Sequence, residues 1–294
     1  MKLPQHIVKP NLFIVGASKC ATTSLWDILR RHPDIFLSNP KEPSWFVRDD
    51  YQEQILSYLA LFQNADGESI VGEASPVYSE TLQFPEVPKR IYDFNPGAKI
   101  IYMVRNPADR LVSVWKQTLS TGHWYRDAYQ ENFGKEVGPM PLDFEKAVFI
   151  YPSFLEACRY WTHLNNYLKV FPADQIHLAF YEDFRDNPEQ LLNGICRFLQ
   201  VDSPAEGWGE HIVRPRNRGE NKTRYRNWYA RLNESKKQQL KRFLPPILLN
   251  RLVSKKIQTR HLLSKKLKRR IEEELSEENR RILEYGGKPA DFWE

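Results

Sequence analysis

The 294-residue sequence is poor in cysteine, with only Cys20, Cys158 and Cys196 scattered along it. Three scattered thiols supply neither a disulfide framework nor the clustered ligands of a zinc site. No apolar run approaches the roughly 20 residues of a membrane span, and the opening MKLPQHIVKP has no signal-peptide stretch. These absences predict a cytoplasmic protein with reduced thiols and no bound metal.

A Walker A sequence with its GK[ST] ending is also missing. In its place, the segment 11–23 (NLFIVGASKCATT) runs from an apolar stretch through Gly16 and a turn of small residues into a helix start. The first N–H groups of a helix lack intrahelical partners, and its dipole favours anions there. Lys19 adds a cation, and hydroxyls follow from Thr22, Thr23 and Ser24. We therefore predict a P-loop-like phosphate-binding turn.

The chain has an excess of positive charge and many aromatic residues. Its net charge is +6, aromatic residues make up 13% of the sequence, and there are eight tryptophans. The sequence pI is about 9.0. A basic protein of this kind favours anionic partners, among them nucleotides and acidic polysaccharides.

Apolar runs alternate with helical patterns along most of the chain. Because fully apolar strands that alternate with helices are typical of buried parallel sheets, we predict an α/β fold with a parallel sheet flanked by helices on both faces. Ligands then bind at the carboxyl ends of the strands. The expected strands are 11–16, 69–72, 98–104 and 175–181, and the expected helices are 22–32, 106–119, 153–169 and 187–199.

A second candidate for phosphate binding follows the apolar run 98–104 (AKIIYMV). Arg105 comes directly after this run, where a P-loop NTPase would usually carry a metal-binding aspartate. Arginine suits a bidentate phosphate contact. Ser113 lies two helical turns beyond Asn106 and joins the candidate site. Two phosphate-type sites on one sheet predict a ligand that is phosphorylated at two places.

Lys41 and Glu42 lie between two prolines in NPKEPSWF, residues 39–46. Pro40 and Pro43 favour an extended backbone that fixes where both side chains point. A carboxylate beside a cation can act as a general base while the lysine stabilises developing negative charge. Adjacent Lys–Glu pairs are also common on surfaces, so this pattern alone leaves a structural role open.

Together, the ordered segments GASKCATTSL, HPDIFLSNPKEPSWF, GEASPVY, YMVRNPADRLVSVW and FYEDFRDNPEQLLNGICRFLQV resemble the sulfotransferase family that uses 3′-phosphoadenosine-5′-phosphosulfate (PAPS). The similarity is greatest to the bacterial and carbohydrate-type branch. It covers about residues 11–200, and the terminal NRRILEYGGKPADFW resembles the closing helix of that branch.

The resemblance implies roles for individual residues. Glu42 is the general base, with Lys19 and Lys41 stabilising the transferring group, and Glu73 and His123 are rival bases. Ala74 stands where the branch often has a lysine, which weakens the expectation of an anionic sugar acceptor. The 5′-phosphosulfate is held by Lys19, Cys20, Ala21, Thr22, Thr23 and Ser24, and the 3′-phosphate by Arg105 and Ser113 with a later loop containing Arg216, Arg218 and Lys222.

We therefore expect a PAPS-dependent sulfotransferase that transfers sulfonate to a hydroxyl of a small-molecule, carbohydrate or lipid acceptor, and that binds no nucleic acid. A non-catalytic nucleotide-binding module and a nucleotide kinase or NTPase are the alternatives. We predict one domain over residues 1–294, with a core at 11–200, a basic variable region at 206–270 and a closing helix at 271–294. The basic region either contacts an anionic membrane or acceptor or is a solvated helical face.

Overall fold

The computed structural model describes residues 8–121, 141–205, 207–209, 223–225, 234–245, 248, 252, 254–256 and 263–294. The chain divides into two compact units. The first contains Met1–Pro107, Ala157–Arg216 and Leu275–Glu294, and the second contains Ala108–Glu156 and Asn217–Glu274. The single domain expected from the sequence stays a prediction, and each unit is described by itself.

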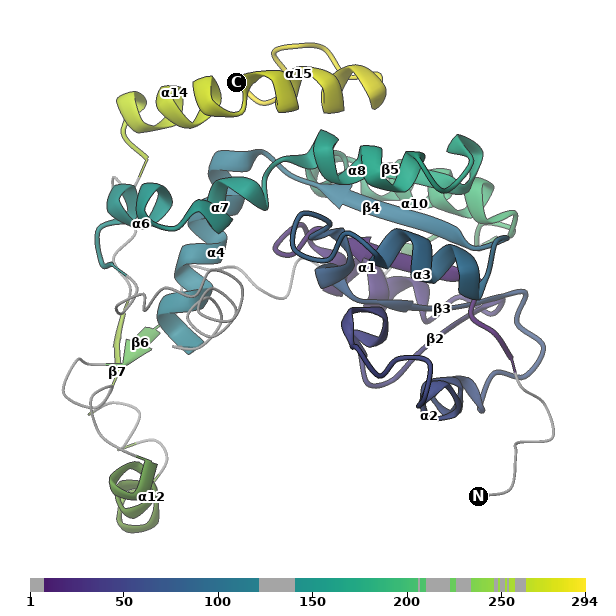
Figure 1. Ribbon diagram of the computed structural model, residues 1–294, viewed down its shortest axis with the longest axis horizontal. Helices are drawn as coiled ribbons and strands as arrows, with labels where there is room; N and C mark the ends of the chain where they lie inside the picture. Colours follow the sequence, from purple (N-terminus) through teal and green to yellow (C-terminus); the bar gives the residue numbers. More distant parts are fainter. Residues whose placement is uncertain are drawn as a thin grey trace. The chain divides into compact units, whose positions relative to one another are not determined.

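A five-stranded parallel sheet forms the centre of the first unit (Figure 1). Its order is β2-β3-β1-β4-β5, so the first strand of the chain lies in the middle. Every residue of β1 is buried, as expected for a strand covered on both faces. This confirms the predicted α/β fold with a parallel sheet. The strands are β1 (Leu12–Gly16), β2 (Ile35–Leu37), β3 (Ile70–Ala74), β4 (Lys99–Val104) and β5 (Ile176–Phe180).

The helices of the first unit lie between these strands or, for those after residue 180, follow the last of them. The α-helices are α1 (Thr22–Leu29), α2 (Ile55–Leu59), α3 (Val87–Phe94), α8 (Tyr160–Leu168), α9 (Tyr181–Asp186), α10 (Pro188–Leu199) and α15 (Ser276–Tyr285), with α4 (Pro107–Thr121) beginning at the unit's boundary. Short 3-10 helices are η1 (Trp45–Val47), η2 (Ala60–Phe62), η3 (Pro76–Ser79) and η4 (Ala173–Gln175).

The direction of the strand connections places helices on opposite faces of the sheet. The β1-to-β2 connection through α1 runs toward one edge, whereas the β3-to-β4 connection through α3 runs toward the other. Because such crossovers are right-handed, the two helices lie on opposite faces. The β4-to-β5 connection through α8 runs in the same direction as the β3-to-β4 connection through α3, so α3 and α8 belong on the same face. The contact between α3 and α8 agrees with this arrangement.

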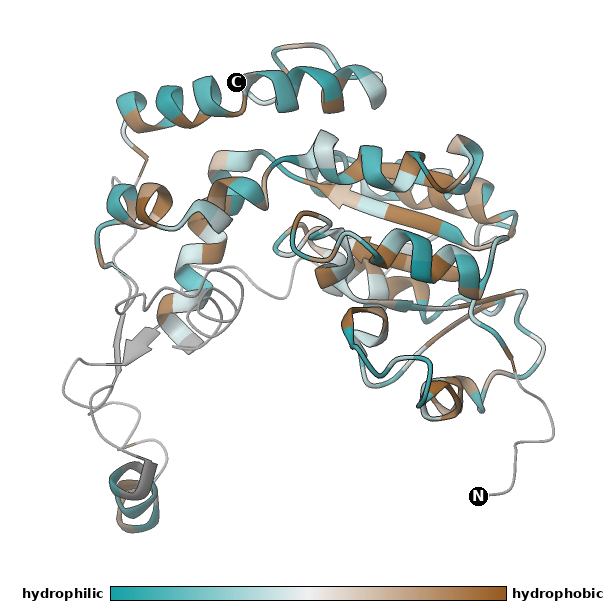
Figure 2. Ribbon diagram, in the orientation of Figure 1, coloured by the Kyte–Doolittle hydropathy of each residue, from teal (hydrophilic) through white to brown (hydrophobic). Residues whose placement is uncertain are grey.

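The second unit consists of helices and a small antiparallel pair of strands. Figure 2 shows α14 as largely hydrophilic, although its Leu267 and Ile271 are buried. Among the described helices, none combines the length and the hydropathy required to cross a membrane. The elements of this unit are α4, α6 (Phe144–Ile150), α7 (Pro152–Glu156), β6 (Thr223–Tyr225), α12 (Glu234–Phe243), β7 (Ser254–Lys256) and α14 (Lys265–Glu274).

Two expectations from the sequence need correction. The predicted helix 153–169 is two helices, because α7 ends at Glu156 and α8 begins at Tyr160. The break coincides with the boundary between the two units, and Arg159 leaves the helical region at ψ 64°. The short edge strand β2 was not expected, because three residues are too few for an alternating pattern to be recognised.

Candidate functional site

The candidate site is built at the carboxyl ends of the five parallel strands. The turn 17–21 follows β1, the loop 38–44 follows β2, and Ser75, Arg105 and Tyr181 follow β3, β4 and β5. Parallel strands end at the same edge of a sheet, so these segments share one edge of the first unit.

The turn after β1 has an uncommon backbone conformation. Lys19 and Ala21 are left-handed, with φ of 69° and 67°. Such left-handed residues in a turn direct neighbouring N–H groups inward and form anion-binding concavities. Ala21 is the N-cap of α1 and provides no capping side chain, and the first turn of α1 has no acidic residue. No carboxylate of this first turn therefore offsets the positive end of the helix.

Cys20 is fully buried within this turn. Its thiol donates to Ser18 O at 3.7 Å, and its Sγ lies 4.0 Å from the Tyr160 hydroxyl. The side chain therefore packs into the core of the turn, and any contact of Cys20 with a nucleotide would be made by its backbone.

Lys41 and Glu42 form an ion pair in the loop after β2. The Glu42 side chain is 49% exposed and that of Lys41 is 12% exposed. Glu42 has φ of 63°, so the extended backbone expected between the two prolines is wrong, and Ser44, after Pro43, has φ of 51°. The chain turns back here because the amides that follow are hydrogen-bonded inward, toward Ser75 and Tyr78.

Glu73 lies in a closed cage of hydroxyl groups near the end of β3. Its side chain is 0% exposed. Oε1 accepts from the hydroxyls of Tyr58 and Tyr78, each at 2.8 Å, and Oε2 accepts from the Ser75 hydroxyl at 2.5 Å. Both carboxylate oxygens are thus occupied, and the group has no open side for a substrate hydroxyl.

Burial raises the pKa of Glu73 to about 7, against the opposing effect of its three hydroxyl donors and of the nearby Lys41 cation. The pKa values of Tyr58 and Tyr78 are raised well above 10, chiefly by burial and then by the Glu73 charge. Lys41 therefore lies close enough to act electrostatically on Glu73 as well as to pair with Glu42.

Arg105 follows β4 directly, as expected, and its backbone is held in place. The Arg105 guanidinium stacks on the Tyr181 ring, with 4.4 Å from Cζ to the ring centroid. The Tyr160 hydroxyl donates to Arg105 O at 2.9 Å. The next residue, Asn106, donates its backbone N–H to Glu182 Oε1 at 2.9 Å and its side-chain amide to Trp293 O at 2.7 Å.

The remaining predicted site residues fall into two groups. Ser113 lies on α4 within the second unit, so the structure does not place it relative to Lys19 or Arg105. His123, Arg216, Arg218 and Lys222 lie outside the described residues.

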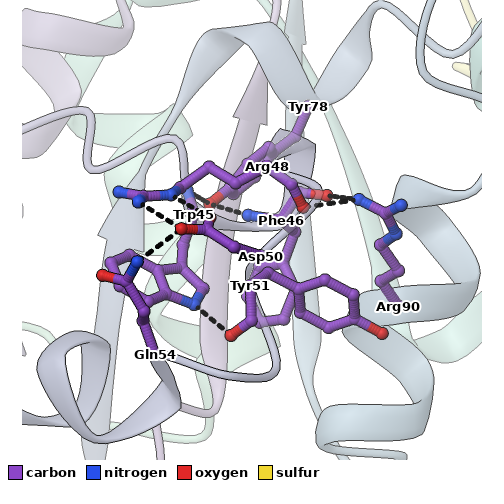
Figure 3. A network of polar contacts seen from close by, with 8 residues as sticks. All are labelled: Trp45, Phe46, Arg48, Asp50, Tyr51, Gln54, Tyr78 and Arg90. Carbon is purple, nitrogen blue, oxygen red and sulfur yellow. Dashed lines mark hydrogen bonds and ion pairs between the residues drawn. The ribbon is translucent and has the colours of Figure 1, made fainter.

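A network of polar contacts fixes the segment after Glu42 (Figure 3). The Arg90 guanidinium donates to Phe46 O at 2.9 Å and to Arg48 O at 3.0 Å. Arg48 forms a bidentate ion pair with Asp50, with distances of 2.9 and 3.0 Å. Figure 3 shows Tyr78 and Arg90 reaching this segment from different elements, η3 and α3.

Sequence reasoning missed the residues that support the site. Ser75 and Tyr78 lie in GEASPVY and Tyr181 and Glu182 in FYEDF, so motif positions carried a signal for them. Nothing in the pattern around Tyr58 distinguishes it from an ordinary core tyrosine, because its link to Glu73 is made only by folding. Among the described residues, no group of three or more His, Cys, Asp or Glu is arranged to hold a metal.

Comparison with known proteins identifies the family, since the sulfotransferase domain matches residues 9–282. The chain belongs to the sulfotransferase family. A solved sulfotransferase from Alicyclobacillus acidocaldarius is 26% identical, with a TM-score of 0.54 over 84% of this chain and 96% of that one. The family assignment made from the ordered motifs is thereby confirmed.

Two curated relatives of this chain are named for carbohydrate substrates. The human heparan sulfate glucosamine 3-O-sulfotransferase 6 is 31% identical over 190 residues, which are 65% of this chain and 52% of the relative. The mouse carbohydrate sulfotransferase 15 is 27% identical over 257 residues, covering 67% and 45%. The chain thus spans about half the length of the curated relatives it matches.

Proposed function

We propose that this chain is a PAPS-dependent sulfotransferase whose acceptor is a carbohydrate hydroxyl. The observation that carries the proposal is the family match over residues 9–282 together with a phosphate-cradle backbone at Lys19 and Ala21. The names of the curated relatives support a carbohydrate acceptor. The cytoplasmic location and the membrane contact of the basic C-terminal region stay predictions.

The turn after β1 would hold the 5′-phosphosulfate through the backbone and hydroxyl groups of residues 19–24. Arg105, stacked on Tyr181 at the end of β4, would bind the 3′-phosphate with Ser113. A guanidinium held in one plane by stacking is suited to bidentate phosphate contact. The basic segment with Arg216, Arg218 and Lys222 would add to this contact.

In the transfer step, an acceptor hydroxyl oxygen bonds to sulfur while the bond from sulfur to the bridging phosphate oxygen breaks. Glu42 takes the hydroxyl proton, and 3′-phosphoadenosine 5′-phosphate leaves. Lys19 and Lys41 stabilise the charge that develops on the bridging oxygen and the sulfonate. Glu42 fits the role of base better than Glu73, because Glu42 is half exposed whereas Glu73 is enclosed by three hydroxyls.

The experiment combines purified protein with PAPS and a panel of carbohydrate, lipid and small-molecule hydroxyl acceptors. We expect mass spectrometry to detect the gain of one sulfonate on a carbohydrate. A non-catalytic module would bind the bisphosphate product without transfer, and an NTPase would instead release phosphate from a nucleoside triphosphate.

Two substitutions test the assignment of the reacting groups. Glu42→Gln should lower kcat about 10²–10⁴-fold with little change in product affinity, because it removes basicity and keeps size. Lys19→Ala should lower kcat about 10²–10³-fold, because it removes a stabiliser of developing charge. Turnover near that of the wild type in either variant at saturating PAPS would contradict the role given to that residue.

A further inference from the structure

We propose that Glu73 is a positioning residue, which holds the loop bearing Lys41 and Glu42 through the hydroxyls of Ser75 and Tyr78. The inference rests on the proposed sulfonate transfer for its effect on activity. The hydrogen bonds that carry it can be measured without any turnover.

Three consecutive backbone amides after Glu42 and Pro43 connect the loop to the Glu73 cage. Ser44 N donates to Ser75 Oγ at 2.9 Å. Trp45 N and Phe46 N donate to the Tyr78 hydroxyl at 2.7 and 3.2 Å. Ser75 and Tyr78 in turn donate to Glu73. The same two hydroxyls thus face the carboxylate on one side and the loop on the other.

The charge of Glu73 sets the direction of these hydrogen bonds. An ionised carboxylate can only accept, so the hydroxyl hydrogens of Ser75 and Tyr78 must point toward it. Their lone pairs are then left for the loop amides, and Tyr78, with one donated and two accepted bonds, is fully satisfied. A neutral side chain at this position would itself donate and would turn at least one hydroxyl away from this arrangement.

The element η3, which supplies Tyr78 to the cage, also lies against the start of the turn after β1. Gly16, the last residue of β1, approaches η3 so closely that a Cβ there would lie 2.2 Å from Ser79 Oγ and 3.0 Å from Pro76 O. The turn with Lys19 and the loop with Glu42 therefore rest on the same short segment, which the Glu73 cage orders. Arg90 holds the loop from its other side through Phe46 O and Arg48 O (Figure 3).

Among the described residues, one cation and three phenols act on Glu73 electrostatically. Lys41 is the cation. The phenols are Tyr58, Tyr78 and Tyr167, whose pKa values are raised chiefly by burial and further by the Glu73 charge. With pKa values well above 10, the three phenols stay neutral near pH 7. The carboxyl has a pKa of about 7, so a modest fall in pH protonates it and weakens the anchoring of the loop.

Tyr58 offers a matched control. Tyr58→Phe and Tyr78→Phe each remove one buried hydroxyl that donates to Glu73 Oε1 at 2.8 Å, but only Tyr78 contacts the loop amides. We expect the amides of Trp45 and Phe46 to exchange at least about tenfold faster in Tyr78→Phe than in Tyr58→Phe, because both lose their acceptor, the Tyr78 hydroxyl. Equal exchange in both variants and the wild type would overturn the proposal.

Kinetics give the second measurement. Tyr78→Phe should lower kcat about 10–100-fold, since a displacement of about 1 Å costs about that much, with a much smaller loss in Tyr58→Phe. In the wild type, kcat should fall as the pH drops through about 7 and Glu73 gains a proton. In Glu73→Gln, kcat should be low at every pH and this step near pH 7 should be absent. Equal losses in the two tyrosine variants, or a retained step in Glu73→Gln, would contradict a positioning role. If the wild type transfers no sulfonate, the proposed function is contradicted instead. Amide exchange would then still show whether Tyr78 anchors the loop.

Discussion

The peptide group that follows Arg105 is fixed by hydrogen bonds to both its carbonyl and its N–H. Tyr160 donates to its carbonyl, and the following amide of Asn106 donates to Glu182. Trp293, near the end of the chain, accepts from the Asn106 side chain and donates to Glu182 Oε2 at 3.2 Å. With Tyr181 under its guanidinium, Arg105 is preorganised in backbone and side chain, which lowers the entropy lost on binding an anion.

We predict that Arg105→Ala weakens binding of 3′-phosphoadenosine 5′-phosphate about 10–100-fold, because a charge-assisted hydrogen bond is lost. Adenosine 5′-phosphate, which lacks the 3′-phosphate, should bind nearly as before. Calorimetric titration of both nucleotides measures the difference. Arg105→Lys keeps the charge but lacks the planar guanidinium that binds phosphate through two hydrogen bonds, so it should recover only part of the affinity. An equal loss for both nucleotides would show that Arg105 has a structural role.

Among the elements, η3 contacts two segments of the candidate site, the turn after β1 and the loop after β2. Its start follows Ser75, its Tyr78 receives the amides after Glu42, and its Ser79 lies against Gly16. Gly16 has φ of 152° and no room for a Cβ, so glycine is required both by conformation and by close approach.

We predict that Gly16→Ala destabilises the fold by about 1–3 kcal/mol, the usual range for overpacking. Urea unfolding measures the change. Gly67→Ala is the matched control, because Gly67 has φ of 92° but open space around its Cβ position. The difference in the free energy of unfolding between the two variants gives the effect of the contact with η3. Equal losses of stability would show that the whole effect comes from backbone conformation.

The elements that could be predicted from the sequence are those with strong local patterns. The apolar run before Arg105 and the Asn-Pro starts of α4 and α10 gave positions that agree closely with the structure. The Glu73 cage could not be predicted, since Tyr58 and the loop amides reach it only through tertiary contacts. The left-handed conformation of Glu42 was missed for the same reason, because distant hydrogen bonds override the local preference imposed by Pro43.

For the molecule as a whole, ionisation of Glu73 lowers the free energy of unfolding. A pKa raised from 4.5 to about 7 means that the folded protein holds this proton more tightly than the unfolded chain. The corresponding stability is fully present below pH 4.5 and is lost as the pH rises through 7. At about 1.4 kcal/mol per pH unit, the loss amounts to about 3 kcal/mol.

We therefore predict that the free energy of unfolding of the wild type falls relative to Glu73→Gln by up to about 3 kcal/mol between pH 5 and pH 8. Urea unfolding at the two pH values measures this. Glu277→Gln is the control, since Arg280 and Arg281 hold the pKa of the exposed Glu277 at about 2, below this window. Parallel curves for the wild type and Glu73→Gln would mean that Glu73 titrates normally.

The central position of β1 bears on how the chain is made. Leu12–Gly16 leaves the ribosome before its two neighbours in the sheet, Ile70–Ala74 and Lys99–Val104. At about 5–20 residues per second, this apolar strand waits roughly 4–17 s for both partners. During that interval its unpaired edges can join other nascent chains. Synthesis in the cell should therefore depend on chaperones that cover LFIVG until β4 has emerged, and chains truncated before β4 should aggregate.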